Sequence, residues 1–303
     1  MLATLVEHPF DDTEWVFETK YDGYRALARL DGNGQVELYS RNLISFNERY
    51  APLVEELQGI KHQALLDGEV VVEDSKHISR FQLLQRYLQE SKGQLIYYVF
   101  DLLYLNGTDI RHLSLLERKS LLEELLAQAE LPHVRFSKHI VGKGIRTYAK
   151  ARQRGLEGII AKHSTSTYIT GKRSTEWQKI KINKEQEAII VGITTPRGSR
   201  SHFGAIALAA YDNKKLIYLG NCGTGFDEKT LASLYKLLKP NFIDRAPFTV
   251  PPIKKNIQWI KPKIVCQIKF TEWTNEGHFR HPVYLGLRTD KSASEVHPER
   301  VKK

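Results

Sequence analysis

Lys20, Asp22, Gly23 and Arg25 form the pattern K-x-D-G-x-R, which joins a possible nucleophile to a turn and a second cation. Apolar residues flank the pattern, so it predicts a strand ending at Lys20, a tight turn with Gly23 at positive φ, and a second strand. Asp22 can accept hydrogen bonds from backbone amides of the turn. A lysine held beside other cations is a candidate covalent nucleophile. The alternative is a β-hairpin whose Lys20 and Arg25 are solvated.

Two carboxylates lie inside apolar runs further along the chain, Glu69 within residues 66–72 and Glu157 within residues 156–162. A carboxylate in such a setting needs a partner or a ligand. Glu69 could accept a hydrogen bond from a ribose hydroxyl, help to hold a metal, or form a buried salt bridge with a core arginine. Gly158 allows a ligand or a hydrated Mg²⁺ to approach Glu157 closely. Lys162 would face away from Glu157 in a regular strand.

Further residues could bind nucleotide or phosphate. Arg41 follows a predicted strand and could bind a phosphate bidentately, although a solvated loop arginine is the simpler interpretation. Phe100 could stack on a base or belong to the core. Trp177, Lys179 and Lys181 share one face of a predicted strand. The two lysines would bind phosphate on the inner face of a cleft and would be ordinary solvated charges on an outer face.

Two domains are expected to position these residues. From Leu2 to about Asn183, short apolar strands alternate with helices, one of which begins at Ser114 with Glu117 in a capping box. Beyond this point the sequence reads as short strands with one helix at residues 229–238. Such a pattern suits a small closed barrel, either an OB fold or an SH3-like barrel. We therefore predict an α+β domain, 1–184, followed by an all-β OB-fold domain, 185–303.

Composition limits the classes of protein that are possible. The 303 residues carry a formal net charge of +10, with a pI near 9.4, which favours a polyanionic partner such as nucleic acid or reflects solubility alone. Two cysteines, Cys222 and Cys266, are too few for a disulfide framework or a four-thiolate zinc site, and suggest a reducing cytosol. The apolar runs are too short to span a bilayer, and no secretory leader follows Met1.

Taken in order, these motifs resemble those of the covalent nucleotidyltransferase superfamily, and most closely those of ATP-dependent DNA ligases. Within these, the chain is similar to the ligase module of bacterial non-homologous end-joining ligases. The resemblance covers nearly the whole chain, beginning with Lys20-Tyr21-Asp22-Gly23-Tyr24-Arg25 and ending with an R-x-D-K motif. The intervening and final matches are Ser40-Arg41-Asn42, Asp67-Gly68-Glu69, Tyr98-Val99-Phe100-Asp101, Glu157 to Lys162, Trp177 to Lys181, and Arg288-Thr289-Asp290-Lys291.

The resemblance implies a nucleotidyltransferase (adenylation) domain of antiparallel sheets before the OB fold. It also implies that Lys20 takes AMP from ATP as a phosphoramidate, after which AMP moves to a 5′-phosphate at a nick and the 3′-hydroxyl displaces it. Mg²⁺ or Mn²⁺ would be held by Glu157, with Glu69 as a second metal-binding candidate. We expect neighbouring cations, namely Arg25, Lys179, Lys181 and the metal, to lower the pKa of Lys20.

The remaining candidates are assigned to cofactor binding by the same resemblance. The implied contacts are Glu18 and Thr19 with adenine, Phe100 with the adenine face, Arg25 and Glu69 with the ribose, Lys179 and Lys181 with the α-phosphate, Arg41 with the phosphate of the nick, and Arg288 and Lys291 with pyrophosphate. Lys162 and Trp177 complete the cofactor-binding set.

The expected partner is nicked or broken duplex DNA in the bacterial cytosol, near the nucleoid, with the protein acting as a monomer. By resemblance, Ku and end-joining polymerase or phosphoesterase modules are further partners. The chain is expected to be either a stand-alone ligase without an upstream DNA-binding domain or a module of a longer polypeptide. Two alternatives remain: an RNA ligase or GTP-using RNA-capping enzyme, and a non-catalytic nucleic-acid-binding protein. The second would not need Lys20, Glu69 and Glu157 together.

Overall fold

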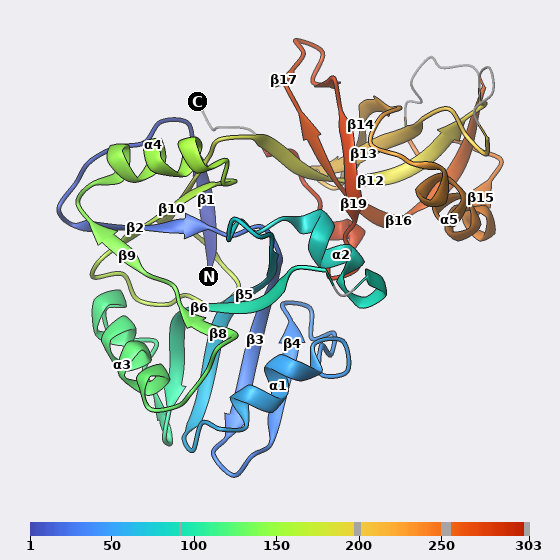
Figure 1. Ribbon diagram of the computed structural model, residues 1–303. Helices are drawn as coiled ribbons and strands as arrows, with labels where there is room; N and C mark the ends of the chain where they lie inside the picture. Colours follow the sequence, from blue (N-terminus) through green and yellow to red (C-terminus); the bar gives the residue numbers. More distant parts are fainter. Residues whose placement is uncertain (91, 197–200, 250–255, 300–303) are drawn as a thin grey trace. The chain divides into compact units, whose positions relative to one another are not determined.

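The computed structural model describes residues 1–90, 92–196, 201–249 and 256–299. These residues form two compact units, Met1–Ile182 and Asn183–Arg300, which divide beside the boundary predicted at residue 184 (Figure 1). Strands dominate both units and a few helices accompany them, so the predicted α+β class is confirmed. In the described part of the chain, no helix combines the length and the apolar character needed to cross a bilayer.

One of the two large sheets of the first unit contains the strand that ends at Lys20. Its strand order is β1-β11-β10-β2-β9, with β1 parallel to β11 and the other neighbours antiparallel. The strands are β1 (Leu2–Val6), β2 (Trp15–Lys20), β9 (His139–Val141), β10 (Gly158–His163) and β11 (Arg173–Lys181). Helix α4 (Gly144–Arg154) packs on one face of this sheet and ends at Gly155, whose φ of 71° is the left-handed conformation that glycine adopts readily.

The second sheet of this unit has the strand order β4-β3-β5-β6-β7, and β8 pairs in parallel with β6. The strands are β3 (Tyr24–Asp31), β4 (Val36–Ser40), β5 (Gln63–Glu73), β6 (Gln94–Leu105), β7 (Thr108–Asp109) and β8 (Val134–Phe136). The β5–β6 register shifts between Asp67 and Gly68. This irregularity lies beside the residues of β5 that reach the candidate site.

Three helices accompany the second sheet: α1 (Ala51–Leu57), α2 (Phe81–Glu90) and α3 (Leu115–Ala127). Helix α3 begins with the predicted capping box, in which Ser114 Oγ accepts the Glu117 backbone N–H and the Glu117 carboxylate accepts the Ser114 N–H. Alternate residues of β3, from Tyr24 to Leu30, are buried, because one face of the strand packs into the main apolar core of this unit. The opposite face of β3 is therefore available to the candidate site.

The described residues of the second unit form an antiparallel sheet accompanied by one α-helix. Its strand order is β14-β13-β12-β16-β15, β19 also pairs with β16, and β17 and β18 form a separate pair. The elements are β12 (Lys184–Thr194), β13 (Ile206–Asp212), β14 (Lys215–Cys222), α5 (Glu228–Leu238), β15 (Phe242–Ile243), β16 (Ile257–Phe270), β17 (Glu272–Trp273), β18 (Phe279–Arg280) and β19 (Val283–Leu287). Leu231, Leu234 and Leu238 of α5 pack into the apolar core of this unit.

Candidate functional site

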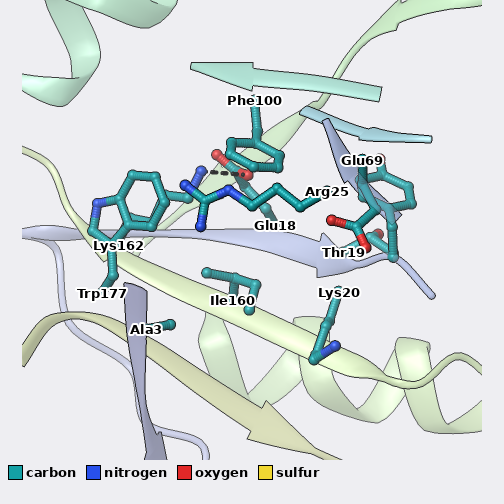
Figure 2. Close-up of a pocket in the computed structure, with 11 residues that line it drawn as sticks. Ala3, Glu18, Thr19, Lys20, Arg25, Glu69, Phe100, Ile160, Lys162 and Trp177 are labelled. Atoms are coloured by element: carbon teal, nitrogen blue, oxygen red, sulfur yellow. Dashed lines mark hydrogen bonds and ion pairs between the residues drawn. The ribbon is translucent and has the colours of Figure 1, made fainter. Parts of the chain in front are cut away.

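The first unit contains a pocket of about 130 Å³ to which both sheets contribute side chains (Figure 2). Strands β1, β2, β10 and β11 supply one set of lining residues, and β3, β5 and β6 supply another. The lining comprises Ala3, Glu18, Thr19, Lys20, Tyr21, Arg25, Glu69, Phe100, Ile160, Lys162 and Trp177. The structure thus brings together most of the predicted site residues of this unit, although Arg41, Glu157, Lys179 and Lys181 lie outside this lining.

The turn after Lys20 passes from one sheet to the other, so β2 and β3 do not form the hairpin considered as an alternative. The prediction of positive φ at Gly23 is also wrong. Glycine is required there for a different reason, since a Cβ would lie 2.1 Å from the Val70 carbonyl oxygen. The Asp22 carboxylate accepts the Phe81 backbone N–H at 3.0 Å and thereby ties the turn to the start of α2. Lys20 is consequently anchored on both sides by ordered backbone.

Strand register places Lys20 and Lys181 on either side of Gly158. In the Cα register Gly158 is opposite Lys20 on β2 and opposite Lys181 on β11, and directly opposed residues share a face of the sheet. A Cβ at Gly158 would lie 2.2 Å from the Ile180 carbonyl oxygen, so the position accepts glycine only. The row therefore holds two lysines on either side of a position that carries no side chain.

The candidate nucleophile forms an ion pair with the candidate metal ligand. Lys20 Nζ donates to Glu157 Oε2 at 2.5 Å, and the two side chains are 20% and 6% exposed. Burial favours the neutral amine, but the Glu157 carboxylate, helped by Glu69, outweighs burial and Lys181, so the pKa of Lys20 is raised. The expectation that cations lower this pKa is therefore wrong, because it overlooked the carboxylate that lies closest to the amine.

Arg25 is fixed by a buried carboxylate rather than left free in the pocket. Its guanidinium forms a bidentate pair with Asp67 at 2.9 and 2.6 Å, and donates to the Met1 carbonyl oxygen at 2.6 Å. Tyr168 Oη donates to Asp67 at 2.8 Å and is 3.1 Å from the guanidinium. Burial raises the pKa of Asp67, yet the charge and hydrogen bonds of Arg25 outweigh it and the pKa is lowered. Arg25 therefore reaches the pocket as a preorganised cation.

Glu18 lies at the centre of a second buried cluster. Its carboxylate accepts from Lys119 at 2.7 Å, from Lys162 at 2.9 Å and from Ser137 Oγ at 3.2 Å. Burial raises the pKa of Glu18, but the two lysines outweigh it and the pKa is lowered. Burial lowers the pKa of Lys162 to about 8, despite the opposing charge of Glu18. The cluster fixes one end of the pocket, and the Lys162 ammonium pairs with Glu18, a partner that the sequence pattern did not predict.

Two aromatic rings border the same end of the pocket. The Lys162 ammonium lies 4.5 Å from the centroid of the Phe100 ring and 4.2 Å from that of the Trp177 ring. The Arg25 guanidinium lies 5.5 Å from the Phe100 centroid, and Figure 2 shows Phe100 and Arg25 as neighbours. A planar apolar ligand group could stack here beside a fixed set of charges.

Glu69 lies opposite Arg25 in the β3–β5 register and lines the pocket. Glu69 and Glu157 offer hard carboxylate oxygens, which suit Mg²⁺ or Mn²⁺. No group of three or more His, Cys, Asp or Glu side chains arranged to hold a metal occurs among the described residues. The pair nevertheless fits Mg²⁺, which keeps several waters and uses one or two carboxylates together with substrate phosphates.

The R-x-D-K motif belongs to the second unit. Arg288 forms a bidentate pair with Asp290 at 2.9 and 2.7 Å, and Lys291 pairs with Glu187. The side chains of Arg288 and Lys291 are therefore held by carboxylates of their own unit, and neither lines the pocket of the first unit.

Sequence reasoning missed several residues that build the site, foremost Lys119, Asp67, Tyr168 and Ser137. Lys119 lies within α3, where a lysine is ordinarily expected to face solvent, yet it is buried against Glu18. Asp67 stands in the same apolar run as Glu69, so the rule that a carboxylate in an apolar strand needs a partner applies to it equally. The signal for Asp67 was present in the sequence, whereas nothing in the local pattern of α3 indicated Lys119.

Both units match families of known proteins. A family model for the ATP dependent DNA ligase domain matches residues 1–181, and one for the ATP dependent DNA ligase C terminal region matches residues 199–291. The multifunctional non-homologous end joining protein LigD of Pseudomonas aeruginosa is 39% identical over 307 residues, covering 99% of this chain and 36% of that protein. LigD of Mycobacterium tuberculosis is 36% identical over 291 residues, covering 94% of this chain and 37% of that protein.

Among solved structures, mycobacterial DNA ligase D complexed with ATP and MES matches with a TM-score of 0.68 and 32% identity, covering 98% of each chain. Together with the family models, this match confirms the predicted architecture of a nucleotidyltransferase domain followed by an OB-fold domain. The chain spans little more than a third of the length of the two LigD proteins that it matches.

Proposed function

The chain belongs to the family of ATP-dependent DNA ligases, and on this premise we propose that it seals breaks in duplex DNA through a lysyl-AMP intermediate at Lys20. Lys20 Nζ attacks the α-phosphorus of ATP, the bond to pyrophosphate breaks, and a phosphoramidate forms. The AMP is then transferred to a 5′-phosphate, with Lys20 Nζ as the leaving group. Attack by the 3′-hydroxyl on that phosphate releases AMP and forms the phosphodiester.

The observation that carries the proposal is the ion pair between Lys20 and Glu157 at the edge of a preorganised pocket. An amine must be neutral to attack phosphorus, and the pair holds Lys20 protonated. When a ligand engages the Glu157 carboxylate, burial and Lys181 become the dominant influences on the pKa of Lys20. Both favour the neutral amine. We therefore infer that Glu157 controls when the nucleophile becomes reactive.

The other residues are proposed to bind and orient ATP. Glu18 and Thr19 contact the adenine, and Phe100 lies on its face, which the aromatic border of the pocket supports. Glu69 and the Asp67-anchored Arg25 contact the ribose. Lys179 and Lys181 contact the α-phosphate, supported by their place on the same face of the sheet as Lys20. Lys162 and Trp177 complete the pocket wall.

The remaining assignments concern phosphates outside the pocket and a metal ion. Arg41 is proposed to bind the phosphate of the nick, and Arg288 and Lys291 to bind the departing pyrophosphate. Glu157 and Glu69 would hold Mg²⁺ or Mn²⁺, which when bound neutralises charge developing on the phosphates. The carboxylate chemistry described above supports this assignment.

The biological setting is proposed from the names of the relatives. Both LigD proteins are named for non-homologous end joining, so we assign this chain to the repair of broken DNA in the bacterial cytosol. Ku and end-joining polymerase or phosphoesterase modules are its proposed partners. The basic composition, with a net charge of +10, supports a polyanionic substrate.

The test is adduct formation followed by sealing. The protein, incubated with ATP labelled at the α-phosphate and a divalent cation, should become labelled, and Lys20→Ala should abolish the label. Lys20→Arg should also remain unlabelled, because the guanidinium group stays protonated and cannot act as the nucleophile. Labelling with GTP in place of ATP, or sealing of nicked RNA but not nicked DNA, would contradict the proposal and favour a capping enzyme or an RNA ligase.

A further inference from the structure

One segment of the first unit carries an unusual share of the positive charge. No acidic residue occurs between Glu130 and Glu157. The interval contains seven Lys and Arg residues, while the whole chain has a net charge of +10. These residues are Arg135, Lys138, Lys143, Arg146, Lys150, Arg152 and Arg154. Helix α4 and its N-cap carry five of them, all exposed.

Three of these residues, Arg146, Lys150 and Arg154, recur at i, i+4 and i+8 and form what we call the α4 basic stripe. At a rise of 1.5 Å per residue, the stripe extends about 12 Å along the helix. No ion pair joins any of the three to a carboxylate within the described ranges of the chain. The pocket cations Lys20, Arg25 and Lys162 differ, since each is paired with a carboxylate.

Helix stability does not account for the stripe. Like charges at i, i+4 destabilise a helix by about 0.2–0.5 kcal/mol per pair. Arg154 lies in the last turn of α4, where the helix dipole favours a cation. Arg146 lies in the first turn, where the helix dipole disfavours positive charge. The first turn contains no acidic residue of its own, and the carboxylate at this end of the helix is that of Asp11, which accepts the Ile145 backbone N–H at 2.8 Å. A bound polyanion would relieve this repulsion, which points to a ligand for the stripe.

The stripe and the pocket belong to opposite faces of one sheet. Phe17, Ile159 and Ile180 form an apolar cluster with Ala151 of α4. Their neighbours Glu18 and Ile160 line the pocket, and successive residues of a strand point to opposite faces. Figure 1 shows α4 lying over this sheet. A duplex whose broken strand reaches Lys20 would have to bend around the sheet to touch the stripe, and DNA is stiff over about 150 base pairs.

We propose that the α4 basic stripe binds the phosphate backbone of a second duplex, distinct from the one whose break lies at the pocket. Duplex DNA presents about one charge per 1.7 Å of its axis, so a stripe of this length faces several phosphates. The stripe has no carboxylate interspersed, which suits a uniformly charged backbone better than a mixed protein surface. The inference rests on the proposed function, which supplies the first duplex, and it gives this unit a means of holding two DNA segments together.

The test measures capture of one duplex by another. Nicked duplex with a blocked 3′ end is fixed to beads, wild-type protein is added, and a labelled intact duplex is then offered. The stripe variant carries Arg146→Gln, Lys150→Gln and Arg154→Gln, which keep helix propensity and remove charge. A control variant with Lys61→Gln and Lys76→Gln, together with Lys92→Gln, removes the same charge from other exposed lysines of this unit.

The stripe variant should capture at least about tenfold less labelled duplex than the control, and its salt dependence should weaken by up to about three in log–log slope. Lysyl-AMP formation and nick sealing should stay near wild-type values in both variants. Equal capture by the two variants, or no capture by the wild-type protein, would overturn the inference; an acidic protein partner beside the exposed Ile140 and Ile145 would then be the alternative. Failure of lysyl-AMP formation in the wild-type protein would count against the proposed function alone.

Discussion

Replacing Glu157 with glutamine tests whether the ion pair controls the protonation of Lys20. Glutamine keeps the size and a hydrogen-bond acceptor and removes the charge. In the wild-type protein the raised pKa of Lys20 means that the neutral fraction grows tenfold per pH unit through the neutral range and beyond. In Glu157→Gln, burial and Lys181 dominate, so the pKa of Lys20 should fall. The neutral fraction should then level off at a lower pH than in the wild-type protein.

The size of the effect follows from the geometry of the pair. Unit charges 4 Å apart attract by about 4 kcal/mol at an effective dielectric constant of about 20. The Lys20–Glu157 pair is closer, at 2.5 Å, but the ammonium is 20% exposed and water screens part of the attraction. If about 3 kcal/mol remains, and each 1.36 kcal/mol is a factor of ten, the neutral amine at pH 7 should become about a hundredfold more abundant.

Acetylation by acetic anhydride at a series of pH values measures that abundance directly. Mass spectrometry would follow the peptide containing Lys20, with the exposed Lys172 as an internal standard. Glu14→Gln, which removes an exposed carboxylate of the same unit, is the matched control. Lys20 should react faster in Glu157→Gln, while Lys172 should not change.

The same variant should behave in the opposite way toward ATP. Glu157 is also the proposed metal ligand, so Glu157→Gln should form lysyl-AMP more slowly although its amine is more reactive. A purely structural role for Glu157 would lower both rates together. If acetylation of Lys20 in the variant follows the wild-type curve at every pH, the reasoning about the ion pair is refuted.

Three further outcomes test the framework of the site. Asp101→Ala should lower the free energy of unfolding by about 3–5 kcal/mol, because it leaves a buried arginine unpaired. Asp109→Ala breaks an exposed bidentate pair with Arg111 and should lower the free energy of unfolding by less than about 1 kcal/mol. Equal losses of unfolding free energy for the two aspartate variants in urea denaturation would contradict this contrast. Gly158→Ala places a methyl 2.2 Å from a carbonyl oxygen, so the backbone beside Lys20 must shift. Because a shift of about 1 Å near reacting groups can lower a reaction rate about 100-fold, the rate of lysyl-AMP formation should fall about 100-fold. Gly223→Ala is the control, because the nearest atom to its added methyl is 3.6 Å away, and it should leave the rate of lysyl-AMP formation unchanged. A wild-type rate in both glycine variants would rule out a catalytic role for the row formed by Lys20, Gly158 and Lys181. Lys291→Ala should lose lysyl-AMP formation and still seal a nick that is supplied already adenylated; equal single-turnover losses on both substrates would make Lys291 a DNA or stability contact.

Features set by neighbours in the chain were predictable. The capping box of Ser114 and Glu117 was expected and is observed, because both halves of the motif lie within one turn of helix. The strand ending at Lys20 was likewise expected, since its apolar residues and the following turn are contiguous. Such features depend on propensities and hydrogen bonds that three or four consecutive residues determine, so no knowledge of the fold is needed.

Features set by strand pairing were not predictable in the same way. The turn at Gly23 was compatible with a hairpin, but β2 pairs with β10 and β3 pairs with β5, so the turn crosses between sheets. Gly23 is needed because Val70 approaches it, a contact made by a strand far along the chain. The pKa of Lys20 has the same origin, since its sign depends on Glu157, 137 residues away. Local patterns identify the groups and leave their partners undetermined.

Buried charges show most clearly where sequence reasoning stops. Leaving such a charge unpaired is costly, so a carboxylate in an apolar strand implies a cation but does not say which one. The rule drew attention to Glu69, yet the salt bridge with Arg25 is made by Asp67, two residues earlier in β5. Both carboxylates lie on the same face of β5, which pairs with β3 without a register shift, so strand alternation alone does not say which of them binds Arg25. Choosing between them required the pairing of β5 with its neighbours, which only the folded chain determines.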